Sequence, residues 1–591
     1  MEFRIKLLKF AFIFLFLGML VRIGYLQLYL GKSYLQQSEN NRLRVVEEDP
    51  VRGFIYDRKG RLIVENIPSY TIAGAPQNIL KNYQSLEKLR AIFNETAENG
   101  WENSARKYYS RPEIRLKRDI EFASLAAVEA NQLHLPGIEV KVESKRHYPY
   151  KTATHIIGFL GEINSSELAN FKGFQPGDIV GKKGIEKTCN SLLFGKKGYR
   201  VIEVDASGNR LADTRRMKNV EPQNGSDIYL TIDLELQEFA EEMLAGWQGA
   251  VVALDPANGD ILVMASSPDY NPEHFAGVLK PETWNSLLDD PAKPLLNRCI
   301  QGTYPPGSIT KMAVLAAALE EKVIDPKEKI VCPGFKQMGN RTFRCWNEGG
   351  HGAINAYQAI EQSCDVYFYE ICLRLGIDKM AEYYRKFGLG NLTGIDIEGE
   401  LPGLIPDSLY MDSRYGVKGW TKGHLLNISI GQGDVLVTPL QGAVFCAALA
   451  NRGKIPVPHL FKSVLYHNPD NWEGHVPEYN YVEGVSEKTY NVLLRGMWDV
   501  VHCEHGTAHW LREPDLQIAG KTGTAQNPHG EDHAWFIGFG PYENPEIVVC
   551  ALVEHGEHGT TMAAPIVVKL IKQYLRMSNA KSPVVSTRAV G

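Results

Sequence analysis

Three short stretches limit what this chain can fold into more than any other feature. They are Ser308-Ile-Thr-Lys311, Ser363-Cys-Asp365 and Lys521-Thr-Gly-Thr524. A serine and a lysine three residues apart share one face of a helix, so the amine can take the hydroxyl proton. A second serine can relay protons, and a Lys-Thr-Gly strand can hold a substrate carboxylate while its glycine lets the substrate backbone come close. The fold must therefore bring together three segments that lie far apart in the sequence.

The first stretch reads as the start of a helix. Pro305-Pro306-Gly307 cannot continue a helix toward the N-terminus, whereas the Ala- and Leu-rich residues after Ser308 favour one. We expect Ser308 at the helix start, where backbone N–H groups point at developing negative charge. Lys311 lies one turn on, and in a dehydrated pocket its amine would lose a proton readily and serve as a base. An isolated Ser-x-x-Lys is more often a capping serine and a surface lysine, but the two partner stretches favour catalysis.

The N-terminus predicts a membrane anchor. Phe10 to Val21 is an unbroken apolar run, and Arg22 is the only charge between it and Leu30. Treated as one helix, Leu7 to Leu30 is long enough to span a bilayer. A cleaved signal peptide is the alternative, but the apolar run is longer than a signal core and no Ala-x-Ala-like site follows it. Basic residues precede the run, so the N-terminus should be cytoplasmic and the rest outside. We assign residues 1–7 to a cytoplasmic tail and 8–30 to the anchor.

Length and composition indicate a multidomain folded protein. A chain of 591 residues is too long for one core, and 44% hydrophobic with 23% charged residues is ordinary for a folded chain. A net charge of −5 gives no argument for nucleic-acid binding. Six of the nine cysteines lie mostly among apolar neighbours and are expected to be buried thiols: Cys189, Cys299, Cys372, Cys446, Cys503 and Cys550.

Strand and helix signals place the catalytic stretches in a C-terminal α+β unit. Residues 249–265 read as a hairpin with a Pro/Asn/Gly turn, and residues 534–540 and 547–553 read as buried strands. Together with the helix after Ser308, they predict an antiparallel sheet flanked by helices. Residues 577–591 are small and polar, which predicts a disordered tail.

The chain resembles the class B penicillin-binding proteins over most of residues 40–575. Besides the three catalytic stretches, the resemblance rests on segments typical of the non-catalytic pedestal and of the transpeptidase domain. These are Arg52 to Asn66, Arg146-His-Tyr-Pro149 with Ala153, His155 and Gly158, Gly184-Ile-Glu186 with Gly195 and Gly198, Gly431-Gln-Gly433, Thr438-Pro-Leu-Gln441, and Trp535-Phe-Ile-Gly538. The resemblance implies a β-rich pedestal (dimerisation-type) domain with a head at 31–225, and a penicillin-binding, serine β-lactamase-like transpeptidase domain at 226–576.

The resemblance also implies an activity and residue roles. Ser308 would be the acylated nucleophile, Lys311 its general base, and Ser363 a proton relay to the leaving group. Lys521, Thr522, Gly523 and Thr524 would form the strand that binds the substrate carboxylate, and the backbone N–H groups of Ser308 and Thr524 would form the oxyanion hole. The implied substrate is a peptidoglycan stem peptide ending in D-Ala-D-Ala, and β-lactams would trap the same serine. No cofactor is implied for the catalysis.

Position 365 departs from the common Ser-x-Asn pattern of the family. An amide can donate a hydrogen bond to a substrate carbonyl, whereas an ionised carboxylate can only accept. Asp365 must therefore pair with a cation, for which Lys311 is a candidate, or remain protonated. Ser-x-Asp resembles the penicillin-binding protein 2 group, which acts in cell elongation, rather than the septal type.

Cys332, Cys345, His351 and Cys364 form a set of soft ligands within one short segment. Three thiolates and an imidazole match a closed, structural zinc site. A Cys332–Cys345 disulfide and unrelated buried thiols are the alternatives. The resemblance favours zinc, because some members of the penicillin-binding protein 2 group hold a zinc ion at corresponding positions. If the chain is extended at Cys364, a metal could pin the second stretch from behind.

Two further histidine pairs, His502-x-x-His505 and His555-x-x-His558, have metal-like spacing. Neither has thiolates or carboxylates arranged around it as a ligand set, so we interpret them as exposed loop histidines.

The predicted function is a serine-type D-Ala-D-Ala transpeptidase that cross-links cell wall during elongation. A septal-type transpeptidase, a D,D-carboxypeptidase and a membrane β-lactam receptor are the alternatives. A receptor would need several membrane spans or a cytoplasmic output domain, whereas this sequence predicts one span with a short tail before it. The resemblance also implies a membrane glycan polymerase and other elongation-complex proteins as partners.

Overall fold

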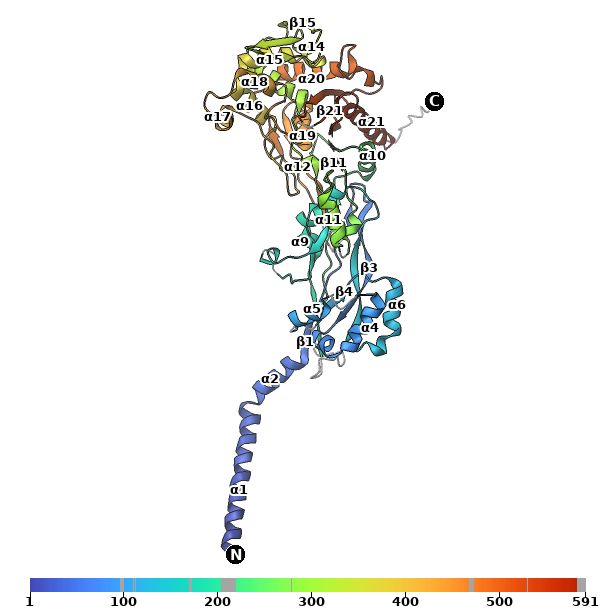
Figure 1. The fold of residues 1–591 in the computed structure, drawn as a ribbon, viewed down its shortest axis with the longest axis vertical. Coiled ribbons are helices and arrows are strands. Elements are labelled where there is room, and N and C mark those ends of the chain that lie inside the picture. Colours follow the sequence, from blue (N-terminus) through green and yellow to red (C-terminus); the bar gives the residue numbers. More distant parts are fainter. Residues whose placement is uncertain are drawn as a thin grey trace, which may run out of the picture. The chain divides into compact units, whose positions relative to one another are not determined.

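The structure is a computed structural model, and it describes residues 1–581 except 96–99, 110, 112, 170–172, 204–218, 278, 467–471 and 529. Contacts divide the chain into two compact units (Figure 1). The first unit comprises Met1–Arg52, Asn66–Arg146 and Phe194–Gly225, and the second comprises Gly53–Glu65, His147–Leu193 and Ser226–Gly591. Each unit has its own buried apolar core.

The N-terminal segment is a single long helix. Helix α1 (Glu2–Gly24) continues into a π-helical turn, η1 (Tyr25–Tyr29). Residues Glu2–Tyr29 are long and apolar enough to cross a membrane, and none of the apolar window is buried in the protein. The predicted apolar helix is therefore confirmed, and it begins before Leu7. An uncleaved anchor and a signal sequence would share these properties.

The rest of the first unit packs short helices against strands. Strands β1 and β8 pair antiparallel, and the C-terminal part of β3 pairs with β4 and β5. Ile72, Leu89 and Trp101 are among the residues of its apolar core. The remaining elements of the unit are α2 (Gly31–Arg42), β1 (Leu43–Glu48), β3 (Leu62–Gly74), α3 (Pro76–Lys81), α4 (Tyr83–Phe93), α5 (Trp101–Lys107), β4 (Ile114–Lys117), α6 (Phe122–Ala130), η3 (Gln132–His134), β5 (Ile138–His147) and β8 (Gly198–Glu203).

Two segments that the sequence analysis assigns to the pedestal belong by contact to the second unit. In Gly53–Glu65, β2 (Ile55–Tyr56) pairs antiparallel with the start of β3, and it also pairs in parallel with β9 (Asp227–Leu230). In His147–Leu193, the Thr154 carbonyl accepts a hydrogen bond from Tyr270 Oη at 3.1 Å. The difference arises because these residues pair with and pack on elements far along the chain.

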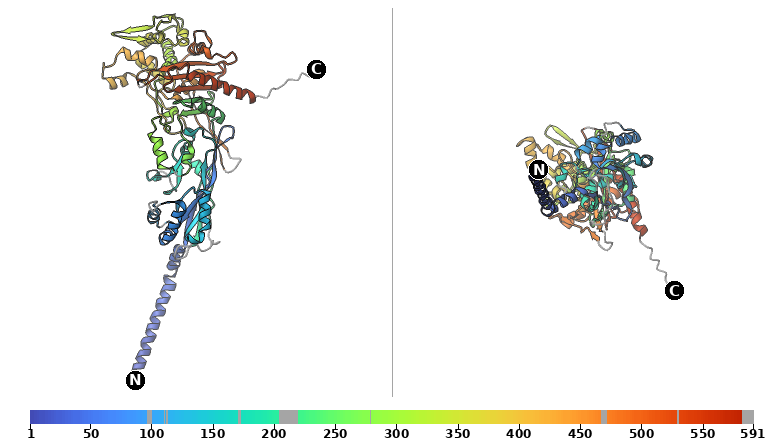
Figure 2. Two further views of the ribbon diagram at one scale, coloured as in Figure 1. Left: turned by 45° about the vertical axis from the view of Figure 1, so that its right-hand side comes forward. Right: turned by 90° about the horizontal axis from the view of Figure 1, so that it is seen from below.

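The second unit is built on the predicted antiparallel sheet flanked by helices. Its five strands run in the order β11-β10-β22-β21-β20. They are β10 (Gly249–Leu254), β11 (Ile261–Ser267), β20 (Ala519–Ala525), β21 (His533–Gly540) and β22 (Ile547–Val553). Side chains alternate between the faces of a strand, so α19 (Pro439–Ala450), beside Trp535, and α21 (Ala563–Lys581), beside Gly538, cover opposite faces. The left view of Figure 2 shows α21 lying along the sheet.

The sequence analysis predicts a disordered tail from residue 577. Residues 577–581 are instead helical, because α21 continues to Lys581. Residues 582–591 lie outside the described residues. The other elements of the second unit are α7 (Thr154–Ile157), β6 (Leu160–Glu162), η4 (Glu167–Ala169), β7 (Ile179–Gly181), α8 (Gly184–Thr188), α9 (Asn190–Phe194), α10 (Leu234–Leu244), η5 (Pro272–Phe275), α11 (Pro281–Asp289), α12 (Arg298–Gln301), η6 (Gly307–Thr310), α13 (Lys311–Glu320), β12 (Ile330–Cys332), β13 (Phe335–Met338), β14 (Arg341–Arg344), β15 (Gly352–Ile354), α14 (Ala356–Glu361), α15 (Asp365–Leu375), α16 (Ile377–Lys386), α17 (Ser408–Tyr415), α18 (Lys422–Ser429), β16 (Lys454–Pro456), β17 (Phe461–Leu465), β18 (Trp472–Gly474), β19 (Tyr479–Tyr481), α20 (Glu487–His502) and η7 (His509–Leu511).

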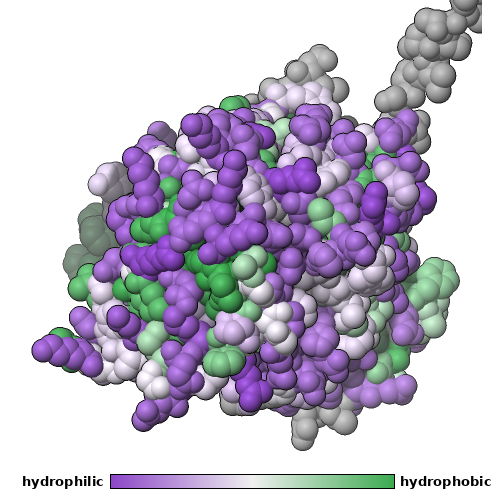
Figure 3. Space-filling view, turned by 90° about the horizontal axis from the view of Figure 1, so that it is seen from above, coloured by the Kyte–Doolittle hydropathy of each residue, from purple (hydrophilic) through white to green (hydrophobic). Residues whose placement is uncertain are grey.

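The end of the second unit that carries α14 and β15 has a mostly hydrophilic surface, with a smaller group of hydrophobic side chains near its middle (Figure 3). Here β12 pairs with β15 and β13 pairs with β14, each as a separate two-stranded sheet. These short strands carry the segment with the cysteine and histidine cluster.

Candidate active site

Ser308 lies in a 3₁₀ turn, η6, that leads directly into α13 at Lys311. Side chains three residues apart eclipse in a 3₁₀ turn, so both project from one side, and the predicted helix start is confirmed. Two hydrogen bonds fix the turn: the Gly307 N–H donates to the Gly431 carbonyl and Trp535 Nε1 donates to the Pro305 carbonyl, each at 2.9 Å. The nucleophile candidate is therefore held by two distant segments of the second unit.

Two glycines let the turn and strand β20 approach each other closely. Gly307 has a φ of +58°, and a Cβ there would lie 2.5 Å from the Thr524 carbonyl oxygen. A Cβ on Gly523 would lie 2.9 Å from Ile309 Cγ2 and 3.0 Å from the Pro306 carbonyl oxygen. The sequence analysis gives the space at Gly523 to the substrate backbone. The structure corrects this, because the turn that carries Ser308 occupies that space.

The second stretch forms the junction between α14 and α15. Ser363 has a φ of +53°, a left-handed conformation that is unfavourable for a non-glycine residue and often found at functional sites. Cys364 follows in an extended conformation and caps α15, with its Sγ accepting a hydrogen bond from the Tyr367 N–H at 3.5 Å. The backbone at Cys364 is thus extended, which is the condition that the sequence analysis sets for a metal to support the second stretch.

The three stretches meet in a buried network of charged groups. Lys311 Nζ donates to Asp365 Oδ1 at 2.7 Å and to Ser363 Oγ at 3.3 Å. Lys521 Nζ donates to the same Ser363 Oγ at 2.8 Å. Both lysine side chains are fully buried. Asp365 therefore pairs with Lys311, which is one of the two outcomes that the sequence analysis leaves open, and Ser363 bridges the two amines.

Lys521 has the perturbed amine of this network. Burial lowers the pKa of Lys521 well below its usual value, the nearby Lys311 ammonium lowers it further, and the Asp365 carboxylate opposes both effects. Two cations share one carboxylate in a site without water access, so the second cation is unfavourable. Because its pKa is lowered, Lys521 loses its proton at a lower pH than an ordinary lysine does.

Strand β20 is the edge strand of the sheet, and its free edge faces the network. The Thr522 carbonyl accepts from Lys521 Nζ at 2.9 Å, and the Thr524 carbonyl accepts from Gln432 Nε2 at 3.1 Å. In an antiparallel strand, the N–H and C=O groups of one residue point to the same side. The backbone N–H groups of Thr522 and Thr524 therefore also point to the free edge.

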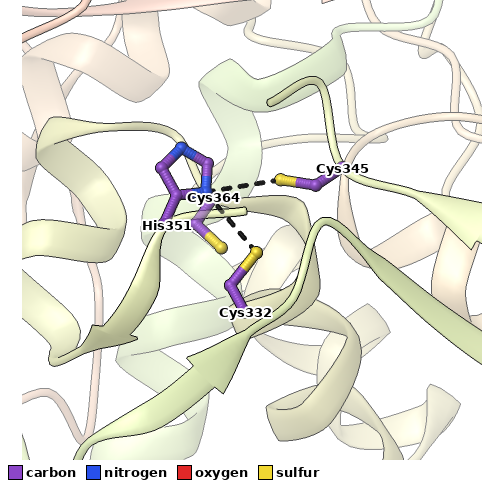
Figure 4. A group of neighbouring side chains, drawn as sticks. All are labelled: Cys332, Cys345, His351 and Cys364. Atoms are coloured by element: carbon purple, nitrogen blue, oxygen red, sulfur yellow. Dashed lines mark hydrogen bonds between the residues drawn. The ribbon is translucent and has the colours of Figure 1, made fainter. Parts of the chain in front are cut away.

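Figure 4 shows Cys332, Cys345, His351 and Cys364 gathered around a common point, as the sequence analysis expects. Their four ligand atoms all lie within 4.8 Å of one another. His351 Nδ1 is 3.5 Å from the Sγ atoms of both Cys332 and Cys345. A tetrahedral zinc with bonds of ~2.3 Å to sulfur and ~2.0 Å to nitrogen separates such atoms by about 3.5 Å. The residues thus fit this metal in number, type and spacing.

All nine cysteines, which lie among the described residues, are free thiols, so the structure does not contain the alternative Cys332–Cys345 disulfide. The pKa of the Cys345 thiol is lowered, first by a hydrogen bond with Cys364 and then by one with His351, while the same contact raises the pKa of Cys364. The cluster therefore favours a thiolate at Cys345.

The other two histidine pairs remain separate from this cluster. His505, His555 and His558 are exposed, as expected. His502 differs, because it lies in α20, is half-buried, and stacks on Trp498 with ring centroids 3.6 Å apart. The sequence analysis places His502 in a loop, whereas α20 extends to this residue.

Among the described residues that contact the catalytic stretches, Gln432, Trp346 and Thr507 have no role assigned in the sequence analysis. Gln432 donates to the Thr524 carbonyl, as described above. The Trp346 backbone N–H donates to Asp365 Oδ2 at 2.9 Å, and Thr507 Oγ1 lies 2.8 Å from Thr522 Oγ1. Gln432 could have been found from its Gly-Gln-Gly context, which is noted above only as part of the resemblance. Trp346 and Thr507 carry no comparable signal, because they reach the site by tertiary contacts.

Comparisons with known proteins agree with this geometry. Residues 249–572 match the family described as "Penicillin binding protein transpeptidase domain", and residues 47–230 match "Penicillin-binding Protein dimerisation domain". The chain is 34% identical over 605 residues to the peptidoglycan D,D-transpeptidase MrdA of Escherichia coli K12, covering 97% of this chain and 93% of that protein.

Two solved structures are also similar. One is the complex between penicillin-binding protein PBP2 and MreC from Helicobacter pylori, with a TM-score of 0.79 and 31% identity, covering 91% of this chain and 100% of that chain. The other is described as "Structural coordination of polymerization and crosslinking by a peptidoglycan synthase complex", with a TM-score of 0.72 and 30% identity, covering 97% and 98% of the two chains.

A five-stranded sheet with Ser-x-x-Lys, Ser-x-Asp and Lys-Thr-Gly-Thr brought together at its edge defines a penicillin-binding transpeptidase unit. The chain belongs to the class B penicillin-binding proteins, and within them to the penicillin-binding protein 2 group that includes the MrdA transpeptidases.

Proposed function

We propose that Ser308 is the nucleophile of a peptidoglycan D,D-transpeptidase that acts in cell elongation and is acylated by β-lactams. The observation that carries this proposal is that Lys311 Nζ and Lys521 Nζ both contact the Ser363 hydroxyl, directly beside the turn that holds Ser308. This arrangement supplies a base, a relay and a cation at the edge of a strand, as serine acyl transfer requires.

In the first half-reaction, Ser308 Oγ attacks the carbonyl carbon of the terminal D-Ala-D-Ala peptide bond and gives its proton to Lys311. The C–N bond then breaks, the nitrogen takes a proton delivered through Ser363, and the terminal D-Ala leaves. In the second half-reaction, an amine from a neighbouring stem attacks the Ser308 ester, and Ser308 Oγ leaves and regains its proton. The product is a cross-link between two stems.

Lys311 must be neutral to accept the proton of Ser308, yet in the resting structure it is paired with Asp365. We propose that its proton first moves through Ser363 Oγ to Lys521. The distances of 3.3 Å and 2.8 Å from Ser363 Oγ to the two amines support this relay. The lowered pKa of Lys521 supports it too, because a neutral Lys521 is available to receive the proton.

The substrate would add along the free edge of β20. Lys521, Thr522 and Thr524 would hold its terminal carboxylate, and Gly523 would keep the strand close to the nucleophile turn. The N–H groups of Ser308 and Thr524 would stabilise the tetrahedral oxyanion. This is supported by the outward direction of the Thr524 backbone and by the close approach of Gly307 to it. Loss of one such donor typically costs about 10²–10³ in rate.

The catalytic unit would lie on the outer side of the inner membrane of a bacterial cell. Arg4, Lys6 and Lys9 lie in the N-terminal part of the helix Glu2–Tyr29, before its apolar run, and they favour a cytoplasmic N-terminus. The helix would remain uncleaved and act as a single-pass anchor.

Partners would include a membrane glycan polymerase and other proteins of the elongation complex. The similar structures support this, because one is a complex between penicillin-binding protein PBP2 and MreC. The other is described as "Structural coordination of polymerization and crosslinking by a peptidoglycan synthase complex".

We also propose that Cys332, Cys345, His351 and Cys364 hold a structural zinc ion. The cluster is buried around its three cysteines, and Cys364 directly follows Ser363, so the metal would support the second stretch from behind. Metal analysis of purified protein should find one zinc per chain, lost in Cys345→Ser and retained in Cys372→Ser, a buried thiol outside the cluster. Metal-free wild-type protein would refute the site.

Incubating the purified full-length protein with stem-peptide substrate and an acceptor amine tests the function. Cross-linked dimers, absent in Ser308→Ala, are expected. Release of D-Ala without dimers would instead indicate a carboxypeptidase. Stable acylation by penicillin without turnover of any stem peptide would indicate a receptor.

A further inference from the structure

Thr507 lies at the third catalytic stretch although it belongs to none of the three. Its Oγ1 is 2.8 Å from Thr522 Oγ1, and its backbone N–H donates to the Glu361 carbonyl at 3.3 Å. Glu361 ends α14, two residues before Ser363. Thr507 therefore connects the helix before the second stretch with the strand of the third, through one backbone and one side-chain contact.

The turn that presents Thr507 is held tightly against the end of α20. A Cβ on Gly506 would lie 2.3 Å from the Val500 carbonyl oxygen and 2.4 Å from that of Asp499. Ala508 is fully buried, and its N–H donates to the same Val500 carbonyl at 2.9 Å. The residues on both sides of Thr507 thus have little freedom, and the direction of its hydroxyl is set by the fold.

The two threonine hydroxyls form a chain that ends at the proposed carboxylate subsite. Thr522 Oγ1 accepts a hydrogen bond from Lys521 Nζ at 3.5 Å, so this contact does not use the Thr522 proton. Each hydroxyl has one proton. If Thr522 gave its proton to Thr507, it would have none for a substrate carboxylate. If Thr507 donates to Thr522, the Thr522 proton is free to point to the carboxylate, and each bond polarises the next.

We propose that Thr507 is a positioning residue for recognition of the substrate's terminal carboxylate. Its hydroxyl donates to Thr522 and thereby turns the Thr522 proton toward the carboxylate. Thr507 is half-buried and lies outside β20, so it acts through Thr522 and is not one of the strand residues at the free edge. This inference rests on the proposed function, because it assumes that β20 binds a carboxylate.

Acylation by benzylpenicillin and by its methyl ester tests this role, since only the free acid has the carboxylate. Thr507→Val keeps the shape of the side chain and removes the hydroxyl, whereas Thr507→Ser keeps the hydroxyl. With the acid, we expect the second-order acylation rate of Thr507→Val to fall about tenfold, in line with weakening one hydrogen bond to a charged group. Thr507→Ser should stay within about twofold of wild type, and with the ester all three proteins should react alike.

The matched control is Thr393→Val, which removes a half-buried hydroxyl that donates to Glu400 Oε1 at 2.6 Å, outside the site. It should leave both rates unchanged. Equal acid rates for wild type and Thr507→Val would overturn the proposal, and so would an equal loss with acid and ester, which indicates a general distortion. If Thr507→Val does not fold, Thr507→Ala against Thr507→Ser carries the same comparison. Wild-type protein that is not acylated at all would instead refute the proposed function.

Discussion

Replacing Asp365 by asparagine should destabilise the second unit, and the structure gives the size of the effect. The carboxylate accepts from Lys311 on Oδ1 and from the Trp346 N–H on Oδ2. An amide has only one oxygen, so its NH₂ must face one of these two donors. Lys311 is fully buried, and in this variant it loses the Asp365 carboxylate as its partner. Removing one member of a buried pair costs ~3 kcal/mol or more.

That cost corresponds to a modest but measurable change in melting temperature. For a unit of roughly 400 residues, the entropy of unfolding is about 0.8 kcal/mol per kelvin, so 3 kcal/mol lowers Tm by about 3–4 °C. Differential scanning calorimetry of the full chain in detergent measures this shift. The matched control is Glu348→Gln, which breaks the exposed pair with Arg344 and should shift Tm by less than about 1 °C. An Asp365→Asn variant that melts with wild type would refute the buried pair.

Two further results follow from the site geometry. Because the pKa of Lys521 is lowered, its amine becomes protonated only as the pH falls below the usual lysine range, so the rate of penicillin acylation should decrease toward acid pH. Lys521→Arg, which stays protonated, should be slow throughout, and a pH-independent wild-type rate measured by stopped flow would contradict the relay. Gly523→Ala should place a methyl group 2.9 Å from Ile309 Cγ2. We expect it to lower the free energy of unfolding by about 1–3 kcal/mol in a denaturation experiment and to slow acylation. Normal stability and a normal rate would show that the strand and the turn do not pack this closely.

Much of the site could be predicted because its residues combine local patterns with distinctive chemistry. The Pro-Pro-Gly sequence before Ser308 marks a helix start, and the alternation and β-rich composition around Lys521 and Trp535 mark strands. The cysteine and histidine cluster could be predicted because three cysteines and a histidine within one short segment are typical of a metal site. Its four ligand atoms do gather within 4.8 Å.

The remaining features depend on contacts that no local pattern encodes. The space at Gly523 could be assigned to the substrate or to the protein until η6 was seen to fill it. The role of Lys521 as the amine with the lowered pKa depends on its burial beside Lys311, which requires the packed structure. Strand β2 (Ile55–Tyr56) lies early in the chain but pairs with β9, because strand pairing does not follow sequence distance.

The proposed mechanism depends on Ser308 as the acylated nucleophile. Intact-mass measurement of the folded full-length protein after incubation with a fluorescent penicillin, followed by peptide mapping, tests it directly. We predict one covalent adduct per chain, on the peptide that contains Ser308, and none in Ser308→Ala. An adduct on any other peptide, or no adduct on folded wild-type protein, would contradict the mechanism.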